Sequence, residues 1–424
     1  MIMSVLEKED NSNKKLNITL FVFILLAMIP SIISVILEQE IKMLIWIWDV
    51  LIIAMCFVYV FFFMKIAINK NNLIKIILGL CVMILQYIAY LTNNYVQSLY
   101  MILPIIFFIH YLISYCMLAS VKIKEIDLSY FFKLFSKFAF IACVYNIIIN
   151  FSSIINISVL SKYIHISSFF NHRNGFGQFL FFAIIGIVYL ILEDKKNKKN
   201  YLLLLFFLFN LLFTFSRASI LATGIFLFLI FFKSSSKGIT KKILWILFLI
   251  VVMILGTIFV INNPSMLEFI DYYVIRTDDG LTGRDTLWMF AIDVFENGNY
   301  LLGYGLGSTV DLLEKFDFTN THNTYVEVLV LGGVMYLLAM LALYIYIYIK
   351  EKKAEKHLEA KFIVFRMSLI SFLVYTFFEK VLLFGTGYAP IITTIFMVTI
   401  PLIIINNIKK SENKEESEWI EEVK

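Results

Sequence analysis

Residues 321–350 read THNTYVEVLVLGGVMYLLAMLALYIYIYIK, and the apolar run inside this stretch decides the fold class. Between Thr324 and Ile349 the run carries a single charged side chain, that of Glu327. A helix needs about 20 consecutive, mostly apolar residues to cross a bilayer. The stretch therefore predicts a transmembrane helix, with the polar side chains of His322 and Asn323 at the membrane boundary.

The whole chain has the same apolar character. Of its 424 residues 61% are hydrophobic and only 16% are charged, and the mean hydropathy is +0.86. No soluble globular domain sustains such values, because its surface has to be polar enough to face water. We therefore expect an all-α polytopic membrane protein.

Further apolar runs predict about twelve transmembrane helices. The runs fall at 17–37, 43–64, 76–92, 98–121, 134–155, 175–192, 201–215, 218–232, 243–261, 324–349, 362–383 and 389–408. They divide the chain into an N-terminal segment (1–16), helices one to nine (17–261), a long external loop (262–323), helices ten to twelve (324–408) and a C-terminal tail (409–424).

The placement of lysine gives the orientation, because short cytoplasmic loops carry an excess of Lys and Arg. With the N-terminus inside, most of the 36 basic residues fall in inner segments, such as Lys195–Lys199 and Lys350–Lys361. We therefore expect both termini in the cytoplasm and the protein in the cytoplasmic (inner) membrane. Its surroundings are the lipid bilayer, and we expect no nucleic acid partner.

Arginine is distributed differently from lysine. Four of the five arginines fall on the predicted outer side, namely Arg173, Arg217, Arg276 and Arg284, whereas Arg366 lies inside. A guanidinium group is planar, permanently charged and able to donate two parallel hydrogen bonds, so it suits phosphate or carboxylate. The alternative is that these arginines pair with nearby Asp and Glu or extend to lipid headgroups.

Two of the arginines lie at the ends of apolar runs. In FFNHRNGFGQFL, His172, Arg173 and Asn174 come just before the run that starts at Gly175. Arg217 follows Ser216 between two short runs, which predict a tight hairpin or a re-entrant pair. An arginine at the centre of a membrane helix costs roughly 2.5 to 3.5 kcal/mol, and less near the interface. Arg217 should therefore face a cavity or an anion.

The external loop contains one predicted helix, within LTGRDTLWMFAIDVFENGNY. Thr282 is the expected N-cap, with Asp285 three residues later, and Asn297-Gly298 is the expected stop. Apolar residues recur at helical spacing at Leu287, Phe290, Ala291, Val294 and Phe295. We expect this short amphipathic helix to lie flat on the bundle or the membrane, with Arg284 at its positive N-terminal end.

The loop also holds a glycine run and several acids. In LLGYGLGSTVD, Gly303, Gly305 and Gly307 are not followed by the Lys-Ser/Thr of a phosphate-binding loop, so the run predicts a surface turn. The acids Asp278, Asp279 and Asp285 lack the alternating spacing of a calcium loop, so we expect them to pair with the arginines.

The four cysteines, Cys56, Cys81, Cys116 and Cys143, all fall in predicted spans and show neither metal-ligand nor disulfide spacing. We expect them to act as small core residues, and we expect no metal and no cofactor.

The order of these features resembles the O-antigen ligase and O-antigen polymerase superfamily. The stretches NHRN, SRAS, GRDTLW and HNTYVEVLVLGGVMY carry the resemblance, which covers about residues 165–345. The last stretch fits the family pattern H-[N/S/Q]-x9-G-x-x-[G/T/Y] through His322, Asn323, Gly333 and Tyr336.

The resemblance implies a membrane-embedded, metal-independent glycosyltransferase. Its donor would be a glycan linked to polyprenyl pyrophosphate, such as undecaprenyl pyrophosphate, at the outer face of the membrane. In such enzymes arginines are thought to hold the pyrophosphate, and a histidine to engage the acceptor hydroxyl. These roles fall on Arg217 and Arg284, with Arg173 in support, and on His322. Supporting positions are His172, Asn174, Ser216, Arg276 and Asn323.

The chemistry requires the same two functions. The leaving pyrophosphate needs charge stabilisation, and the attacking hydroxyl needs a base. His322 is the favoured base, with Glu327 as the alternative; Glu327 lies five residues later, about 140° round a helix. His110, Asp49 and the neighbours Glu379 and Lys380 are weaker candidates in or near predicted spans. The neighbours Glu379 and Lys380 most simply neutralise each other.

Three functions fit the sequence. The first is a polymerase that joins lipid-linked repeat units into O-antigen, capsular polysaccharide or exopolysaccharide. The second is a ligase that moves finished glycan to another acceptor. The third is a transporter of lipid-linked oligosaccharide, which is disfavoured because the polar groups gather at one face. Expected partners are the lipid-linked donor and the glycan acceptor, with a flippase and a chain-length regulator of the same pathway.

Overall fold

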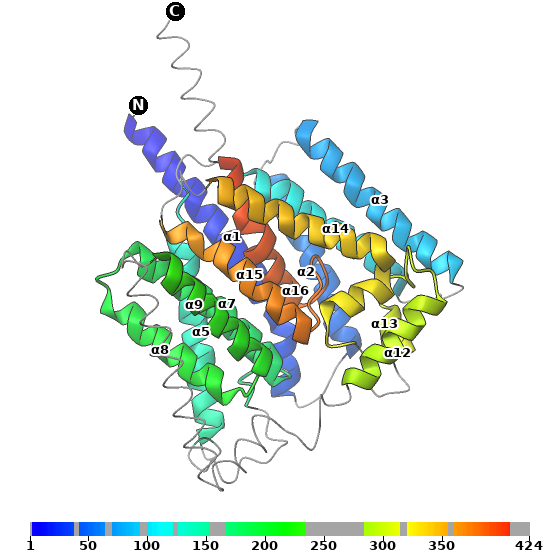
Figure 1. Ribbon diagram of the computed structural model, residues 1–424. Coiled ribbons are helices and arrows are strands. Elements are labelled where there is room, and N and C mark those ends of the chain that lie inside the picture. The colour runs from blue at the N-terminus through cyan, green and yellow to red at the C-terminus, as the bar shows by residue number, and fades with distance from the viewer. Residues whose placement is uncertain are drawn as a thin grey trace, which may run out of the picture.

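The computed structural model describes residues 2–37, 42–63, 70–93, 100–121, 126–151, 154, 166–234, 284–313, 320–354 and 360–407, and regular structure in these ranges is helical. Figure 1 shows the helices gathered in one bundle. Within the described ranges, seven helices are long and apolar enough to cross a membrane, and apolar helices at Ile47–Phe62 and Ile363–Phe378 are shorter. The prediction of an all-α polytopic membrane protein is confirmed.

The helices used below are given with their bounds in chain order. They are α1 (Ile2–Ile36), α2 (Lys42–Phe63), α3 (Lys70–Thr92), α4 (Leu103–Tyr111), α5 (Ser129–Ile149), α7 (Arg173–Glu193), α8 (Lys198–Phe213), α9 (Arg217–Ser234), α12 (Arg284–Asn297), α13 (Ser308–Leu312), α14 (Thr324–Ala354), α15 (Ile363–Phe378) and α16 (Tyr388–Thr394). Short 3-10 and π turns extend α4 to the range Tyr100–Ser120, and α16 continues as helix to Asn407.

Helix α7 forms the core of the bundle. It has no charged side chain between its two ends, nearly all its residues are buried, and it packs against α5, α8, α9, α15 and α16. Glycines allow this packing: a Cβ atom at Gly186 would lie 2.7 Å from the Phe132 ring, and one at Gly177 2.7 Å from Ser219 Oγ. Because lipid chains are as apolar as leucine, close packing of this kind holds membrane helices together. It fixes the start of α7 against α9.

Helix α14 is kinked at Gly333, where the backbone has φ 62° and ψ −166°. The loop before α13 fills the kink: Tyr304 N–H donates to Val330 O at 2.8 Å, and Val334 N–H donates to Tyr300 O at 2.9 Å. Gly303 also has a positive φ of 66°, and a Cβ there would lie 2.6 Å from the backbone of α14. The loop therefore satisfies the backbone groups that the kink frees, as a membrane setting requires.

The structure of this region corrects the predicted continuous span and confirms the predicted glycine turn in part. The apolar run 324–349 predicted a continuous span, but the structure divides it at Gly333. The glycine run does form a turn, as predicted, but Gly303, Gly305 and Leu306 are buried rather than on the surface. Packing against α3 explains the difference, because Tyr90 at the end of α3 donates a hydrogen bond to Leu306 O at 2.6 Å.

The other predicted elements agree with the structure except at some ends. The loop helix runs from Arg284 to Asn297 as expected, buries Leu287 and Ala291, and packs against α14. The predicted span 362–383 is wrong at its C-terminal end, because α15 ends at Phe378. The predicted span 134–155 starts too late, because α5 begins at Ser129. The predicted N-cap Thr282 and the predicted span 243–261 lie outside the described residues.

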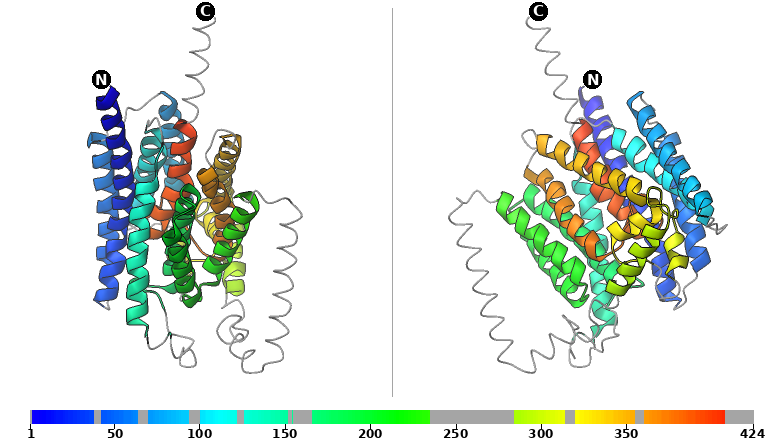
Figure 2. Two further views of the ribbon diagram at one scale, coloured as in Figure 1. Left: turned by 90° about the vertical axis from the view of Figure 1, so that its left-hand side faces the viewer. Right: turned by 45° about the vertical axis from the view of Figure 1, so that its right-hand side comes forward.

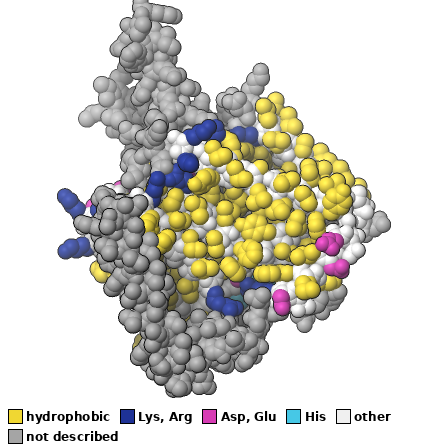
Figure 3. Space-filling view, in the orientation of Figure 1, with side chains coloured by type: hydrophobic (Ala, Val, Ile, Leu, Met, Phe, Trp, Pro, Cys, Tyr) yellow, Lys and Arg dark blue, Asp and Glu magenta, His cyan; other side chains and the backbone are white. Residues whose placement is uncertain are grey.

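A mostly hydrophobic band covers the visible face over α14 and α15, with basic side chains above and below it (Figure 3). The start of α1 and the end of the helix after α16 lie at one end of the bundle, as Figures 1 and 2 show. This agrees with an arrangement in which both termini lie on the same side of a membrane. That this side is cytoplasmic stays a prediction.

Candidate functional site

Polar side chains from four helix ends meet around Glu379, the residue that follows α15. Its Oε1 accepts a hydrogen bond from Asn174 Nδ2 at 2.6 Å and pairs with Arg284 at 3.3 Å. Its Oε2 lies 3.4 Å from Nδ1 of His322. The three partners come from the start of α7, the start of α12 and the residues before α14. One carboxylate thus connects the start of α7 with segments that lie more than a hundred residues later in the chain.

Arg284 is held at the N-terminus of α12 with part of its side chain accessible. Besides pairing with Glu379, its guanidinium donates to Phe378 O at 2.7 Å. Trp288, one turn later, donates from Nε1 to Thr321 O at 2.7 Å and so ties α12 to the segment that carries His322. The bonds from Arg284 to Phe378 O and to Glu379 use two of the five N–H donors of the guanidinium group. An anion at the helix terminus would meet the remaining donors and the positive end of the helix dipole.

His322 sits in a backbone conformation that is rare for a side chain of its size. Its φ is +50°, in the left-handed region. The conformation is held by the surrounding segment: the His322 N–H donates to Asn320 Oδ1 at 2.9 Å, and the Thr321 hydroxyl donates to Asn323 O at 2.8 Å. Such strain costs of order 1 to 3 kcal/mol and is concentrated at functional sites.

Asn323 directs the chain from His322 into the membrane. Its Oδ1 accepts from the N–H groups of Tyr325 at 2.9 Å and Val326 at 3.2 Å, so it is the N-cap of α14. Capping residues satisfy N–H groups that have no partner inside the helix. Asn323 is buried and has its side-chain oxygen fully engaged in this way. The contribution of Asn323 is therefore to fix the position of His322.

Glu327 lies at the centre of a second, buried cluster. Its Oε1 accepts from the Thr309 hydroxyl at 2.7 Å and pairs with Lys380 Nζ at 3.0 Å, and its Oε2 accepts from Thr321 N–H at 2.9 Å. The side chain is completely buried, whereas that of Lys380 is 29% exposed. The expected angle of 140° from His322 does not apply, because the helix begins only at Thr324.

The sequence predicts that Glu379 and Lys380 most simply neutralise each other, and this expectation is wrong. The ion pairs instead connect Glu379 to Arg284 and Lys380 to Glu327. The residues were placed inside a span because the apolar run continues through Val381 and Leu382. The signal that could have identified them is their cost: two adjacent charged residues in an apolar segment are expensive unless the chain leaves the membrane there.

Arg217 is the first residue of α9, in the predicted hairpin between α8 and α9. The turn is built by Thr214, whose Oγ1 accepts from Ser216 N–H at 3.1 Å, and by Phe215, which has a φ of +49°. The buried Ser216 hydroxyl lies 3.0 Å from that of Ser219, and both pack on α7 at Gly177. Because Gly177 is one turn from Asn174, this packing places the exposed Arg217 at the same end of the bundle as Glu379.

Arg173, His172 and Asn174 form the start of α7. His172 is the N-cap, since its Nδ1 accepts from Asn174 N–H at 3.2 Å, and Arg173 is half-buried. At Gly175 a Cβ would lie 2.0 Å from the Tyr388 hydroxyl, so this turn packs closely on α16. Asn174 reaches Glu379 from this turn. The predicted residue Arg276, with Asp278 and Asp279, lies outside the described residues.

The other candidates lie away from this cluster. His110 is fully buried in α4, with Nδ1 3.0 Å from Gly385 O and its ring packed on Phe23 and Phe384. Asp49 is buried in α2. Neither makes a described contact with Glu379 or His322, so the geometry does not bring them into the site.

One family comparison covers part of this arrangement. The model of the family described as O-antigen ligase matches residues 202–341, a range that includes Arg217, Arg284, His322 and Glu327. It stops before Glu379 and begins after Arg173. No curated protein matches the sequence. The resemblance drawn from the sequence is thus supported over residues 202–341, where this multi-pass membrane protein is similar to the O-antigen ligase family.

Proposed function

We propose that the protein is a polymerase that joins polyprenyl-pyrophosphate-linked repeat units into O-antigen, capsular polysaccharide or exopolysaccharide. The observation that carries the proposal is the position of Glu379, which brings Arg284 and His322 within reach of one carboxylate. A cation for the leaving group and a base for the acceptor are thus adjacent. The site would face the outer side of the cytoplasmic membrane, where the flippase of the pathway delivers the donor and a chain-length regulator acts on the product.

In the proposed reaction the acceptor hydroxyl oxygen bonds to the anomeric carbon of the donor sugar. The bond from that carbon to the pyrophosphate oxygen breaks, and the lipid pyrophosphate leaves with the electron pair. Arg284, Arg217 and Arg173 stabilise the negative charge that develops on the leaving oxygen. Charge stabilisation by fixed donors in a partly dry site is usually the largest single contribution to catalysis.

His322 would take the proton of the acceptor hydroxyl. With Nδ1 turned to Glu379, the imidazole presents Nε2 to the acceptor, and the carboxylate stabilises the imidazolium that forms. The distance of 3.4 Å is long for a hydrogen bond, but catalytic contacts are often long before substrate binds and shorten in the complex. Glu379 is then a positioning residue, because it acts through His322 and Arg284.

Glu327 is the less suitable base, because Lys380, Thr309 and Thr321 occupy its oxygens and its side chain is inaccessible. We propose that it holds the segment of His322 in place. Glu327→Gln should keep transfer within about ten-fold of wild type, because the amide oxygen still accepts from Thr321 N–H; the lost charge should cost about 2 kcal/mol of stability.

The measurement for Glu327→Gln combines the transfer rate with the melting temperature in detergent. Asp293→Asn on α12, an exposed carboxylate, is the matched control and should change neither. A loss of more than about a hundred-fold in rate at an unchanged melting temperature would instead identify Glu327 as the base.

A ligase is the second candidate, because the matching family model is described as O-antigen ligase. The two functions differ in product. In a deletion strain, a polymerase without activity leaves glycan of a single repeat unit attached to the acceptor, whereas a ligase without activity leaves long glycan on the lipid carrier. We expect the strain that carries Arg284→Ala to show single-repeat products on a glycan gel, and the wild-type gene to restore the ladder.

The control for this experiment is the amount of each variant in the membrane fraction. Long glycan that accumulates on the lipid carrier would replace the polymerase by the ligase. A normal ladder with Arg284→Ala present at the wild-type level would contradict both. A transporter would give a third result, with lipid-linked repeat units retained on the cytoplasmic face.

A further inference from the structure

A cavity of about 470 Å³ lies between α3, α4 and α14. Apart from Gln86, Cys81 and several tyrosines, the side chains that line it are apolar, among them Val82, Phe107, Met335 and Met340. A cavity of this composition inside a membrane protein suits a hydrocarbon rather than a sugar.

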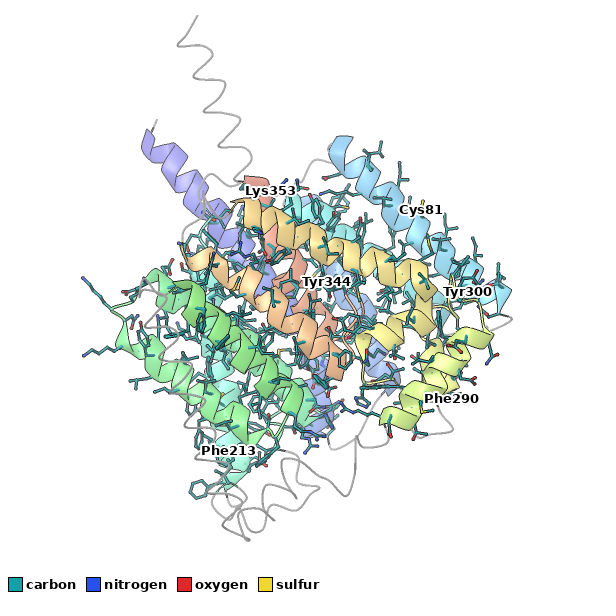
Figure 4. All side chains as sticks on the ribbon, in the orientation of Figure 1. Cys81, Phe213, Phe290, Tyr300, Tyr344 and Lys353 are labelled. Carbon is teal, nitrogen blue, oxygen red and sulfur yellow. The ribbon has the colours of Figure 1, made fainter. Side chains whose placement is uncertain are left out.

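The cavity opens to the side of the bundle. Leu78 and Met335 line it and are 58% and 50% exposed, on helices whose outer faces would contact lipid. Cys81 also lines it, midway along α3 (Figure 4), and its exposure corrects the expectation that all four cysteines are core residues. A hydrocarbon chain could therefore pass from the bilayer into the cavity without crossing a polar barrier.

The inner wall of the cavity continues into the candidate site. Leu382, Leu383 and Phe384 line the cavity and follow Glu379 and Lys380 in the same short connection after α15. This connection is fixed at both ends: Val381 N–H donates to Thr324 Oγ1, and Phe384 N–H donates to Thr394 Oγ1, each at 2.9 Å. The residues that bind the polar cluster and those that line the cavity thus belong to one rigid segment.

The histidine motif also reaches the cavity. Gly333 produces the kink in α14, and Gly332 just before it and Tyr336 three residues after it form part of the lining. Tyr336 packs edge-on against Phe107 on the opposite wall, with ring centroids 6.1 Å apart. The segment from His322 to Tyr336 therefore runs from the polar cluster at the start of α14 to the apolar cavity beyond the kink.

We propose that the cavity between α3, α4 and α14 binds the isoprenoid chain of the lipid-linked donor. The inference rests on the proposed function, because it assumes a donor whose pyrophosphate lies at Arg284. A lipid with its head at that site and its chain along Leu382–Phe384 would leave the bundle between α3 and α14. Lys380, 29% exposed at the start of this path, pairs with Glu327 and so holds this connection against the start of α14.

Cys81 allows a direct test, because the other three cysteines are buried. Purified protein in detergent is treated with N-phenylmaleimide, and the rate of Cys81 alkylation is measured by mass spectrometry. Saturating undecaprenyl pyrophosphate should slow this rate by about five-fold or more, because the occupied cavity excludes the reagent. Geranyl pyrophosphate, with the same head and a short chain, and phosphatidylglycerol should slow it by less than about two-fold.

The matched control is a reporter thiol outside the cavity. Leu202, on the exposed face of α8, is replaced in Cys81→Ser protein, and Leu202→Cys alkylation should not respond to undecaprenyl pyrophosphate. Equal protection by phosphatidylglycerol would make the cavity a general lipid site and overturn the proposal. No protection of Cys81 by any of the three lipids would place the chain elsewhere and overturn it too.

A kinetic variant separates this inference from the proposed function. Ala339→Phe fills the cavity from α14 and should raise KM for the lipid-linked donor roughly ten-fold with kcat little changed. Leu338→Phe, on the neighbouring lipid-facing position, should leave both constants unchanged. Equal KM values in the two variants, in protein that still polymerises glycan, would refute the cavity assignment alone. Wild-type protein that shows Cys81 protection but no glycan transfer would refute the proposed function alone.

Discussion

Arg284→Ala should lower the rate of glycan transfer by about 10²- to 10³-fold, the usual effect of removing one fixed donor to a developing negative charge. Arg284 is oriented by two contacts, since its guanidinium donates to both Phe378 O and Glu379 Oε1. These contacts hold it rigidly at the start of α12 before substrate binds. A donor that is already oriented costs no reorganisation in the transition state.

The lysine variant tests the geometry of the group rather than its charge. Arg284→Lys keeps a cation but replaces the planar fork by a single ammonium, which cannot span Phe378 O and an incoming phosphate together. We expect it to recover only part of the rate, since Arg and Lys are not equivalent at sites that use several directed hydrogen bonds. The transfer rate from a purified lipid-linked repeat unit is the measurement.

Asp285→Ala is the matched control, because Asp285 is the next residue of α12 and is exposed. It should transfer glycan at the wild-type rate. If Arg284→Ala also retained that rate, in protein with an unchanged elution profile on size exclusion, Arg284 would be a structural ion-pair partner of Glu379. The pyrophosphate would then have to be held by the other arginines.

The sequence predicts most helices and only part of the site. Both shortfalls have one cause, namely tertiary contacts that no local sequence pattern contains. Apolar runs determine where helices form, because a spanning segment has to satisfy its own backbone hydrogen bonds. The end of α15 at Phe378 is not visible in this way, since the apolar run continues to Phe384. What stops the helix is tertiary: the Thr324 hydroxyl, from a helix 55 residues away, donates to Glu379 O at 2.9 Å.

The same tertiary contact explains why Glu379 is only a weak candidate in the sequence. Inside a span it is only a costly charge, whereas outside the helix it lies between Arg284 and His322. The residues that were predicted, such as Arg284, stand out locally because arginine is rare in this chain. Glu327 was predicted as a site residue, but its engagement with Lys380 depends on a contact that no local pattern contains.

His322→Asn should lower the transfer rate by about 10²- to 10⁴-fold, the range for loss of a general base. Asparagine is the appropriate replacement, because it tolerates the left-handed backbone at φ +50° better than alanine does. The variant therefore removes the imidazole and keeps the turn that starts α14. Protein that folds as wild type and has lost its activity separates catalysis from stability.

Two further measurements identify what the imidazole does. Free imidazole added to His322→Gly protein should restore part of the rate if proton transfer is what was lost. Glu379→Gln should couple to His322→Asn by about 1 to 2 kcal/mol in a double-mutant cycle, because the carboxylate acts partly through the imidazole. Glu379→Gln also weakens the contact to Arg284, so its cost should not vanish in the His322→Asn background.

Retention of activity in His322→Asn would also have a specific meaning. If His322→Asn kept the wild-type rate, the proton would have to leave through another group, and the contact of 3.4 Å between His322 and Glu379 would be structural. If the two substitutions were simply additive, Glu379 would serve Arg284 alone. The cycle thus decides whether the carboxylate at the centre of the site supports the base, the cation or both.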